Sequence, residues 1–198
     1  TVADIVLGVS IAYLLTRTRI PFKGILDALS MLPLALPGLV LAFGYLAGFS
    51  GTFLDARHYP VPLLVIAYAV RRLPYMVRAA YAGFQQTSIT LEEAARNLGA
   101  SKMRTTLEIT FPLIIANLVA GGILCFAFAM LEVSDSLILA QRAVDYPITK
   151  AIYTLFERLG DGPGIASAMG VWGMALLGVT LIGASAIMGK KMGAIFRV

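Results

Sequence analysis

The chain has 198 residues, of which 59% are hydrophobic and 14% are charged, with a formal net charge of +5 and a mean hydropathy of +0.83. Soluble domains are about a quarter charged, so this composition excludes an ordinary soluble protein and predicts an all-α, polytopic bundle of transmembrane helices. The basic residues lie in short loops beside apolar segments, which argues against a nucleic-acid-binding protein. Cys125 and His58 are the one cysteine and the one histidine, so no disulfide, metal site or cofactor is expected.

Five apolar segments predict about five membrane spans. The first, residues 2–16, is close to the shortest length that crosses a hydrocarbon core of ~30 Å, and the chain begins with Thr1 rather than Met. We therefore expect a fragment of a longer protein. The second segment, residues 28–54, carries no charge but contains Pro33 and Pro37, which kink a membrane helix and free backbone carbonyls.

The third segment, residues 61–84, contains three arginines: Arg71, Arg72 and Arg78. Charges in or beside a span are costly unless they face water, the bundle interior or the interface. Two interpretations are open. The arginines anchor the cytoplasmic end of the helix, or they line an inner vestibule and pair with acidic groups. We favour the anchor, because positive residues commonly flank spans on the cytoplasmic side.

A polar stretch, residues 88–112, separates two apolar segments and carries its own helix signals. Thr90 and Glu93 have the spacing of a capping box, and Gly99 lies where a left-handed residue would end a short helix. A second helix is expected to follow an N-cap at Ser101 and to bend at Pro112. One side of the first helix is apolar and consists of Leu91, Ala94, Ala95 and Leu98.

This stretch also resembles the EAA loop of the inner-membrane permeases of binding-protein-dependent ABC importers. The resemblance rests on the spacing of Glu93-Ala94-Ala95, Gly99, Ile109 and Phe111-Pro112, with Phe111 replacing the usual Leu. In that family the short helix is a coupling helix that docks into a cleft on a cytoplasmic ATPase. The alternative is an ordinary capped helix between two spans. The residues expected to couple to the ATPase are Glu93, Ala94, Ala95, Arg96, Gly99, Ile109 and Pro112.

The resemblance further implies a function, a location and a set of partners. Residues 1–198 would form a single permease domain, a fragment or half of a longer permease, in the inner (plasma) membrane. Its partners would be a cytoplasmic ATP-binding ABC subunit, a periplasmic or lipoprotein solute-binding protein, and a second permease half or a copy of the chain, surrounded by membrane lipid. The chain itself is not expected to be an enzyme, because its nearest approach to a phosphate loop, residues 183–190, has the wrong spacing.

The fourth segment, residues 109–131, is followed by two carboxylates, Glu132 and Asp135. Three positions apart on one helical face, they would suit a cation, although a capping or interface role is more common. A long loop, residues 132–164, is expected to contain an amphipathic helix that begins at Pro147. Its apolar face would consist of Ile148, Ala151, Ile152, Leu155, Phe156 and Leu159, with Lys150, Thr154, Glu157 and Arg158 opposite.

The distribution of Lys and Arg predicts the sidedness of the protein. Basic residues gather at residues 17–23, within residues 88–112, and after the last apolar segment, residues 162–189, where Lys190, Lys191 and Arg197 lie. Positive residues are enriched in cytoplasmic loops. The stretch 88–112 is therefore expected in the cytoplasm and the loop 132–164 in the periplasm.

The transported solute is the least determined feature. The segments SDSLILAQ and YPITKAIYTLFERLGDGP resemble the ferric-iron and related small-anion or thiamine branch of these permeases, which implies ferric iron or another small solute. Two other functions stay open: an ion-coupled secondary transporter, which needs charges on broken helices, and a non-transporting structural membrane subunit. The candidate residues for a pathway or gate are Arg71, Arg72, Arg78, Glu132 and Asp135.

Overall fold

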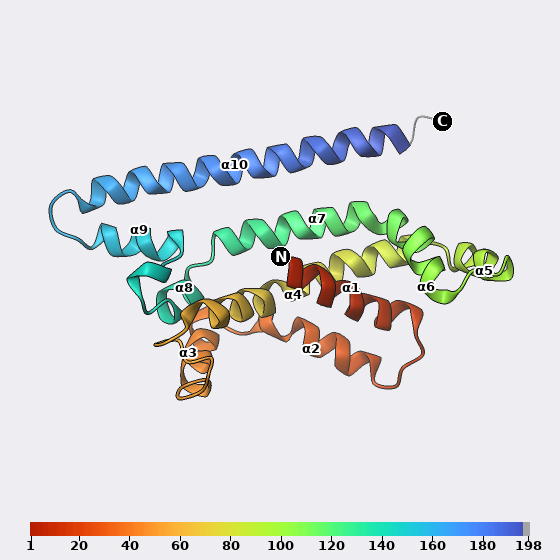
Figure 1. The fold of residues 1–198 in the computed structure, drawn as a ribbon, viewed down its shortest axis with the longest axis horizontal. Helices are drawn as coiled ribbons and strands as arrows, with labels where there is room; N and C mark the ends of the chain where they lie inside the picture. Colours follow the sequence, from red (N-terminus) through yellow and green to blue (C-terminus); the bar gives the residue numbers. More distant parts are fainter. Residues whose placement is uncertain (196–198) are drawn as a thin grey trace. The chain divides into compact units, whose positions relative to one another are not determined.

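The computed structural model describes the backbone of residues 1–195 and the side chains of residues 1–186, and its regular structure there is entirely helical (Figure 1). Lys190, Lys191 and Arg197, which entered the prediction of sidedness, lie outside the described side chains. Two compact units can be separated. The first contains Thr1–Leu32 and Arg72–Cys125, and the second contains Pro33–Arg71 and Phe126–Ile187.

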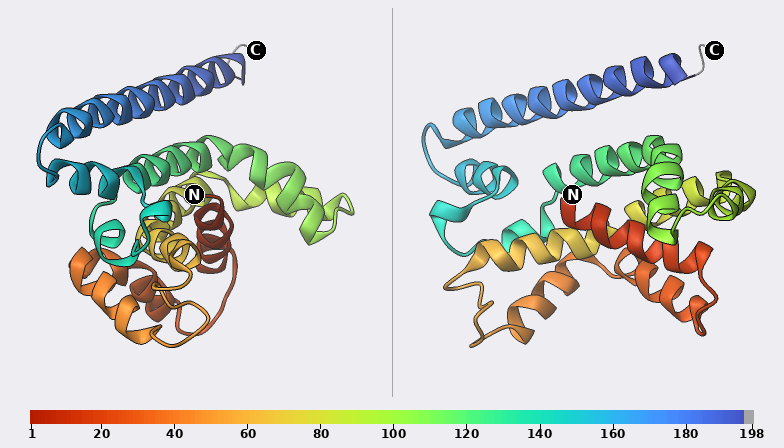
Figure 2. Two further views of the ribbon diagram at one scale, coloured as in Figure 1. Left: turned by 60° about the vertical axis from the view of Figure 1, so that its left-hand side comes forward. Right: turned by 45° about the vertical axis from the view of Figure 1, so that its right-hand side comes forward.

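The first unit is built on α1 (Val2–Arg17), the C-terminal part of α4 (Pro60–Gln86) and most of α7 (Phe111–Met130). Small residues let these helices approach closely, as is common between membrane helices. A Cβ atom added at Gly8 of α1 would come within 2.5 Å of Met76 in α4, and one added at Gly121 of α7 would come within 2.6 Å of Ala79. Figure 2 shows α1 beside α4.

Interlocking apolar side chains form the core of this unit. The buried residues are Ala12, Met76, Ala80, Phe84, Ile114, Leu118 and Cys125. The unit also contains the start of α2 (Lys23–Ala35), and α5 (Ile89–Asn97) with α6 (Lys102–Thr105). A π-helical turn, Thr106–Thr110, joins α6 to α7 without a break.

The second unit contains α3 (Gly38–Gly48), the N-terminal part of α4, α8 (Ser134–Leu139), α9 (Ile148–Phe156) and residues 162–187 of α10 (Gly162–Ile195). A 3-10 turn, Ala143–Asp145, lies between α8 and α9. The buried core of the second unit consists of Ala56, Leu63, Leu64, Ala67, Leu139 and Ala140. Within residues 162–186 of α10 only Gly162 and Ala166 are buried, and Ile148 of α9 is the near neighbour of Gly173.

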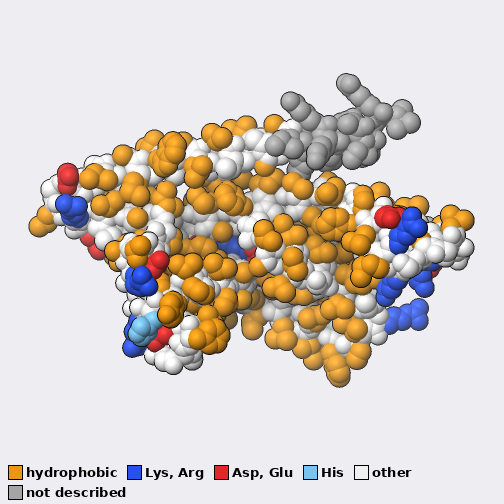
Figure 3. Space-filling model, in the orientation of Figure 1, with side chains coloured by type: hydrophobic (Ala, Val, Ile, Leu, Met, Phe, Trp, Pro, Cys, Tyr) orange, Lys and Arg blue, Asp and Glu red, His pale blue; other side chains and the backbone are white. Residues whose placement is uncertain are grey.

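Three stretches among the described residues are long and apolar enough to cross a membrane: Pro60–Gln86, Lys102–Met130 and Gly162–Ala186. The second expected span is not one helix, because α2 and α3 meet at an angle of 104° beside Pro37. It counts as a fourth span if the bent pair crosses as a unit. The first expected span corresponds to α1, which has 16 residues. The exposed surface of these helices is largely hydrophobic (Figure 3), as a lipid-facing bundle requires.

Candidate functional site

The start of α5 is capped by a residue other than the predicted one. Ser88 is the N-cap, and its Oγ accepts a hydrogen bond from the Thr90 amide at 3.3 Å and contacts the Thr90 hydroxyl at 2.7 Å. The predicted Thr90–Glu93 capping box is therefore wrong, because α5 already begins at Ile89 and Thr90 lies within its first turn. Two hydroxyl residues compete for the cap in this sequence, and the earlier one makes it.

The end of α5 follows the prediction. Gly99 has φ of +90°, in the left-handed region that L side chains rarely adopt. The Gly99 amide donates to the Arg96 carbonyl at 3.0 Å, and the Ala100 amide donates to the Ala95 carbonyl at 3.1 Å. This pair of bonds is a Schellman motif. A nine-residue helix is too short to be stable alone, so caps at both ends matter to its rigidity.

The residues predicted on the apolar side of α5 differ in their burial. Ala95 is buried, whereas Leu91 and Ala94 are exposed and Leu98 is 91% exposed. Glu92 takes the inward position beside Ala95, and its side chain is 17% exposed. Among the predicted coupling residues, Glu93 and Arg96 are exposed and help to line an open polar depression with Asn97, Ala100 and Lys102.

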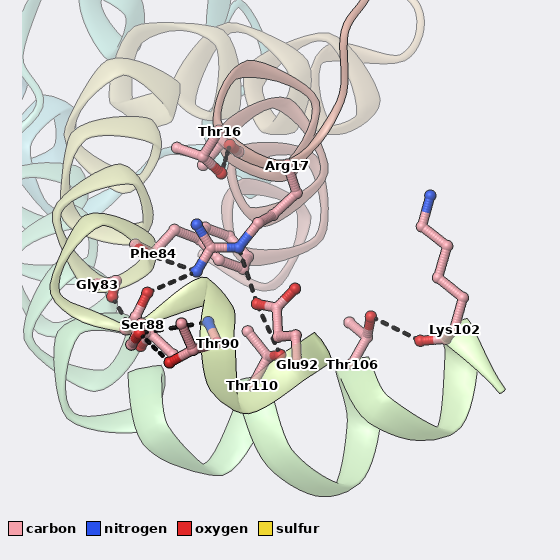
Figure 4. A network of polar contacts seen from close by, with 12 residues as sticks. Thr16, Arg17, Gly83, Phe84, Ser88, Thr90, Glu92, Lys102, Thr106 and Thr110 are labelled. Carbon is pink, nitrogen blue, oxygen red and sulfur yellow. Dashed lines mark hydrogen bonds and ion pairs between the residues drawn. The ribbon is translucent and has the colours of Figure 1, made fainter. Parts of the chain in front are cut away.

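A partly buried ion pair holds the inner side of α5. Arg17, the last residue of α1, donates from Nε to Glu92 Oε1 at 2.8 Å, and the same oxygen accepts from the Thr110 hydroxyl at 3.1 Å (Figure 4). Arg17 Nη2 donates to the carbonyls of Phe84 at 2.9 Å and Thr87 at 2.8 Å. The Arg17 side chain is 7% exposed. One guanidinium thus satisfies acceptors from three parts of the chain.

The sequence analysis missed this pair. It counted Arg17 among the basic residues of a loop and left Glu92 without a partner. The available signal was the position of Glu92, three residues before the inward Ala95 and therefore on the same helical face. Nothing in the sequence pointed to Arg17 as the partner, since 75 positions separate the two residues.

The second helix of the loop begins as predicted. Ser101 Oγ accepts from the Arg104 amide at 3.3 Å, which makes Ser101 the N-cap of α6. The distortion near Pro112 is the π turn, in which the Phe111 amide bonds to the Thr106 carbonyl. Ile109 is half-buried in that turn, and Pro112 follows it in the first turn of α7. On the exposed face, Arg104 pairs with Glu108 at 2.8 Å.

Among the candidate pathway residues, Arg71 is the centre of a buried cluster in the second unit. Its guanidinium donates to both carboxylate oxygens of Asp135 at 2.8 and 2.9 Å and to the Gly38 carbonyl at 3.0 Å. Glu132 lies 3.5 Å away. The Arg71 side chain is 11% exposed, which argues against the anchor interpretation for this residue. The two carboxylates do meet a cation, and Glu132 also accepts from the Asp135 amide at 3.3 Å at the start of α8.

The other two arginines belong to the first unit. Arg78 pairs with Asp27 at 3.1 Å, and both side chains are partly exposed. Arg72 is buried, and its carbonyl accepts a hydrogen bond from the Cys125 thiol at 3.5 Å. Arg71 and Arg78 therefore have separate partners.

The loop 132–164 contains the expected helix, α9, although its polar face differs from the prediction. Lys150 is half-buried, and its ammonium donates to the carbonyls of Leu137 and Ala140 at the end of α8, at 2.8 and 2.6 Å. A cation at a helix C-terminus is favoured by the helix dipole. Phe156 and Leu159, which were expected on the apolar face, are exposed.

A comparison with known protein families decides the class. The model of the binding-protein-dependent transport system inner membrane component matches residues 4–192. The chain belongs to this family. It is an inner-membrane permease of an ABC importer, its ATPase is a separate subunit, and a binding protein is its other partner. Membership favours this function over the ion-coupled transporter and the structural subunit.

Several characterised permeases are similar to the chain. The molybdate/tungstate transport system permease protein WtpB of Methanocaldococcus jannaschii is 30% identical over 98% of the chain and 78% of that protein. The molybdenum transport system permease protein ModB of Escherichia coli K12 is 32% identical over 80% of the chain and 75% of that protein. The ferric transport system permease protein FbpB of Actinobacillus pleuropneumoniae is 33% identical over 82% of the chain but 23% of that protein.

Proposed function

We propose that the chain forms half of a translocation pathway for a tetrahedral oxyanion, molybdate or tungstate, and that α5 couples this pathway to a cytoplasmic ATPase. The observation that carries the coupling role is the construction of α5. It is capped at both ends, anchored on one side by Glu92 and Ala95, and exposed on the other at Leu91, Ala94 and Leu98. A short rigid helix whose exposed face carries both apolar and polar side chains is suited to dock on a partner and to transmit its movement.

The docking face combines apolar contact with charge. Leu98 offers an almost fully exposed side chain, and the polar depression beside it presents Glu93 and Arg96. Apolar anchors bordered by charged groups are typical of protein interfaces. We propose that ATP-driven closure of two ATPases moves two such helices and alternates the access of the pathway between the two sides of the membrane.

The substrate proposal rests on the relatives and on charge. The permeases that are similar over most of their own length are named for molybdate, tungstate or molybdenum. Ferric iron is the second candidate, since the ferric transport permease is also similar to this chain. A bare ferric ion would need a cluster of oxygen ligands, whereas Glu132 and Asp135 are already held by Arg71.

The same cluster gives no free positive charge for an oxyanion, because Arg71 is neutralised by two carboxylates. We therefore propose that the external binding protein selects the solute. The exposed apolar side chains of α10, such as Trp172 and Val179, would lie against lipid or against a second permease subunit.

Transport by the reconstituted importer tests the substrate. The full permease would be placed in proteoliposomes with its ATPase and binding protein, and uptake of molybdate, tungstate, sulfate and ferric citrate would be compared with and without ATP. We expect ATP-dependent uptake of molybdate and tungstate. Uptake of ferric citrate alone would favour the second candidate, and uptake without ATP would contradict the coupling role of α5.

A further inference from the structure

We infer that Arg17 is a positioning residue that ties the coupling helix α5 to α1 and to the end of α4, so that a displacement of α5 moves these membrane helices. The inference rests on the proposed coupling role of α5. Arg17 itself does not lie on the docking face, because its side chain is 7% exposed.

The geometry suits a junction between segments. The Arg17 guanidinium holds the Glu92 carboxylate of α5, the Phe84 carbonyl of α4 and the Thr87 carbonyl just beyond it, each within 2.9 Å. Arg17 also lies over the Phe84 ring, 5.6 Å from its centroid. The planar fork of arginine can address several acceptors in fixed directions, which the single ammonium of lysine cannot. Figure 4 shows Phe84 and Glu92 converging on Arg17.

The residues around the Arg17–Glu92 pair show which segments it connects. A polar cleft lies between the end of α1 and α5, and it is lined in part by Thr16, Arg19, Lys23, Glu93 and Arg96. Arg17 and Glu92 also line this cleft and bridge it. On its other side, α5 contacts α6 and the π turn, which continue into α7. The chain itself joins α5 to α4 through residues 87–88 and to α7 through α6, so the Arg17–Glu92 pair adds the connection to α1 that neither covalent path supplies.

The test compares two arginines that make ion pairs of equal length in different settings. Arg17→Gln removes the partly buried pair with Glu92, and Arg104→Gln removes the exposed pair with Glu108, each 2.8 Å long. The reconstituted importer would be assayed for molybdate uptake and for ATP hydrolysis. For Arg17→Gln we expect the ratio of uptake to hydrolysis to fall by about tenfold, because the side-chain connection between α5 and α1 is lost. For Arg104→Gln we expect the wild-type ratio, since an exposed pair contributes little.

A covalent crosslink in place of the Arg17–Glu92 ion pair tests whether Arg17 acts as a mechanical connection or is needed for its charge. In a Cys125→Ala background, the pair Arg17→Cys and Glu92→Cys would be joined by a short bifunctional thiol reagent. We expect the unjoined pair to be uncoupled and the joined pair to recover most of the wild-type ratio. Joining without recovery would overturn the inference.

The proposed function and this inference fail in different ways. If Leu98→Cys in a permease that keeps Arg17 forms no crosslink with the ATPase, the proposed coupling role of α5 is contradicted. If that crosslink forms and Arg17→Gln keeps the wild-type ratio, the inference alone is overturned. Arg17→Lys, which keeps the charge, is expected to insert normally and to show an intermediate ratio. Failure of the Lys variant to reach the membrane would make Arg17 a folding residue and overturn the positioning role.

Discussion

Gly99 is the residue where backbone conformation and proposed function meet most directly. Its φ of +90° has a counterpart at Gly160, where φ is +87°, and at both positions an added Cβ would meet nothing within 4 Å. A substitution at either residue therefore introduces backbone strain without a clash. The two glycines differ in place: one ends α5 and the other lies in the loop after α9.

Gly99→Leu is expected to abolish ATP-coupled uptake while leaving membrane insertion intact. A non-glycine residue held in the left-handed region costs about 1–2 kcal/mol, which is enough to unwind the last turn of a short helix. Gly160→Leu, with the same strain elsewhere, is the control and is expected to retain uptake. The measurement is uptake normalised to the amount of permease in the membrane. Normal uptake by Gly99→Leu would contradict the requirement for a rigid α5.

Substitutions in the buried cluster around Arg71 are expected to change the thermal stability of the protein. Arg71→Met removes the guanidinium that both oxygens of the buried Asp135 carboxylate accept from, and stranding a buried charge costs about 3–5 kcal/mol. A clear drop in the thermal unfolding temperature in detergent is expected. Adding Asp135→Leu to Arg71→Met should recover part of this loss, because the stranded carboxylate is removed. A double variant no more stable than the single one would contradict this account.

At the scale of elements, local signals predicted some features of the loop and not others. The Gly99 stop and the Ser101 cap were predictable because each depends on residues within one helical turn. The cap at Ser88 was mistaken for Thr90, since both residues carry hydroxyls of the right kind. The sharp bend between α2 and α3 was expected only as a kink: two prolines indicate where a helix is disturbed, but tertiary packing decides how far the chain turns.

The exposed face of α5 predicts which substitutions weaken assembly. Leu98→Asp is expected to reduce copurification of the ATPase, because a charge replaces an apolar contact at the proposed interface. Leu159→Asp is a matched control, since Leu159 is 94% exposed and Leu98 is 91% exposed. Leu159 lies beyond the end of α9 and belongs to the second unit, whereas α5 belongs to the first. Equal recovery of ATPase with both variants would argue against α5 as the docking element.

The loop between α3 and α4 predicts a pH dependence. The amides of Gly51 and Arg57 donate to the Asp55 carboxylate at 2.8 and 2.9 Å, and these hydrogen bonds lower the pKa of Asp55 from its ordinary value of 3.8. A lowered carboxyl pKa stabilises the folded loop above the ordinary value. This stabilisation is lost as the pH falls through the lowered pKa.

Amide hydrogen exchange measures this effect. Protection of the Gly51 and Arg57 amides is expected to fall below pH 3.8, beyond the intrinsic change in exchange rate. In Asp55→Asn the additional pH dependence should disappear. Its persistence in that variant would assign the effect to another group.

At the scale of the whole molecule, composition and hydropathy were sufficient for the class. An apolar chain with basic loops predicted a helical membrane protein, and the family comparison confirmed an inner-membrane permease. Contacts between segments distant in sequence were not predictable. Arg17 and Glu92 are 75 positions apart, and Arg71 and Asp135 are 64 apart. In each case the sequence showed charged residues without indicating their partners.

The side of the membrane that each loop faces is a further prediction about the whole molecule. In the Cys125→Ala background, a membrane-impermeant thiol reagent added to intact cells is expected to label Leu159→Cys, in the loop 132–164, but not Leu98→Cys. In inside-out vesicles the pattern should reverse, because the two residues belong to loops predicted on opposite sides. Labelling of Leu98→Cys in intact cells would place α5 outside and remove it from the reach of a cytoplasmic ATPase.

A single atom, Glu92 Oε1, accepts both the Arg17 and the Thr110 hydrogen bonds. Arg17 belongs to α1 and Thr110 to the π turn that leads into α7. A displacement of α5 that carries this oxygen therefore acts on two membrane helices at one point.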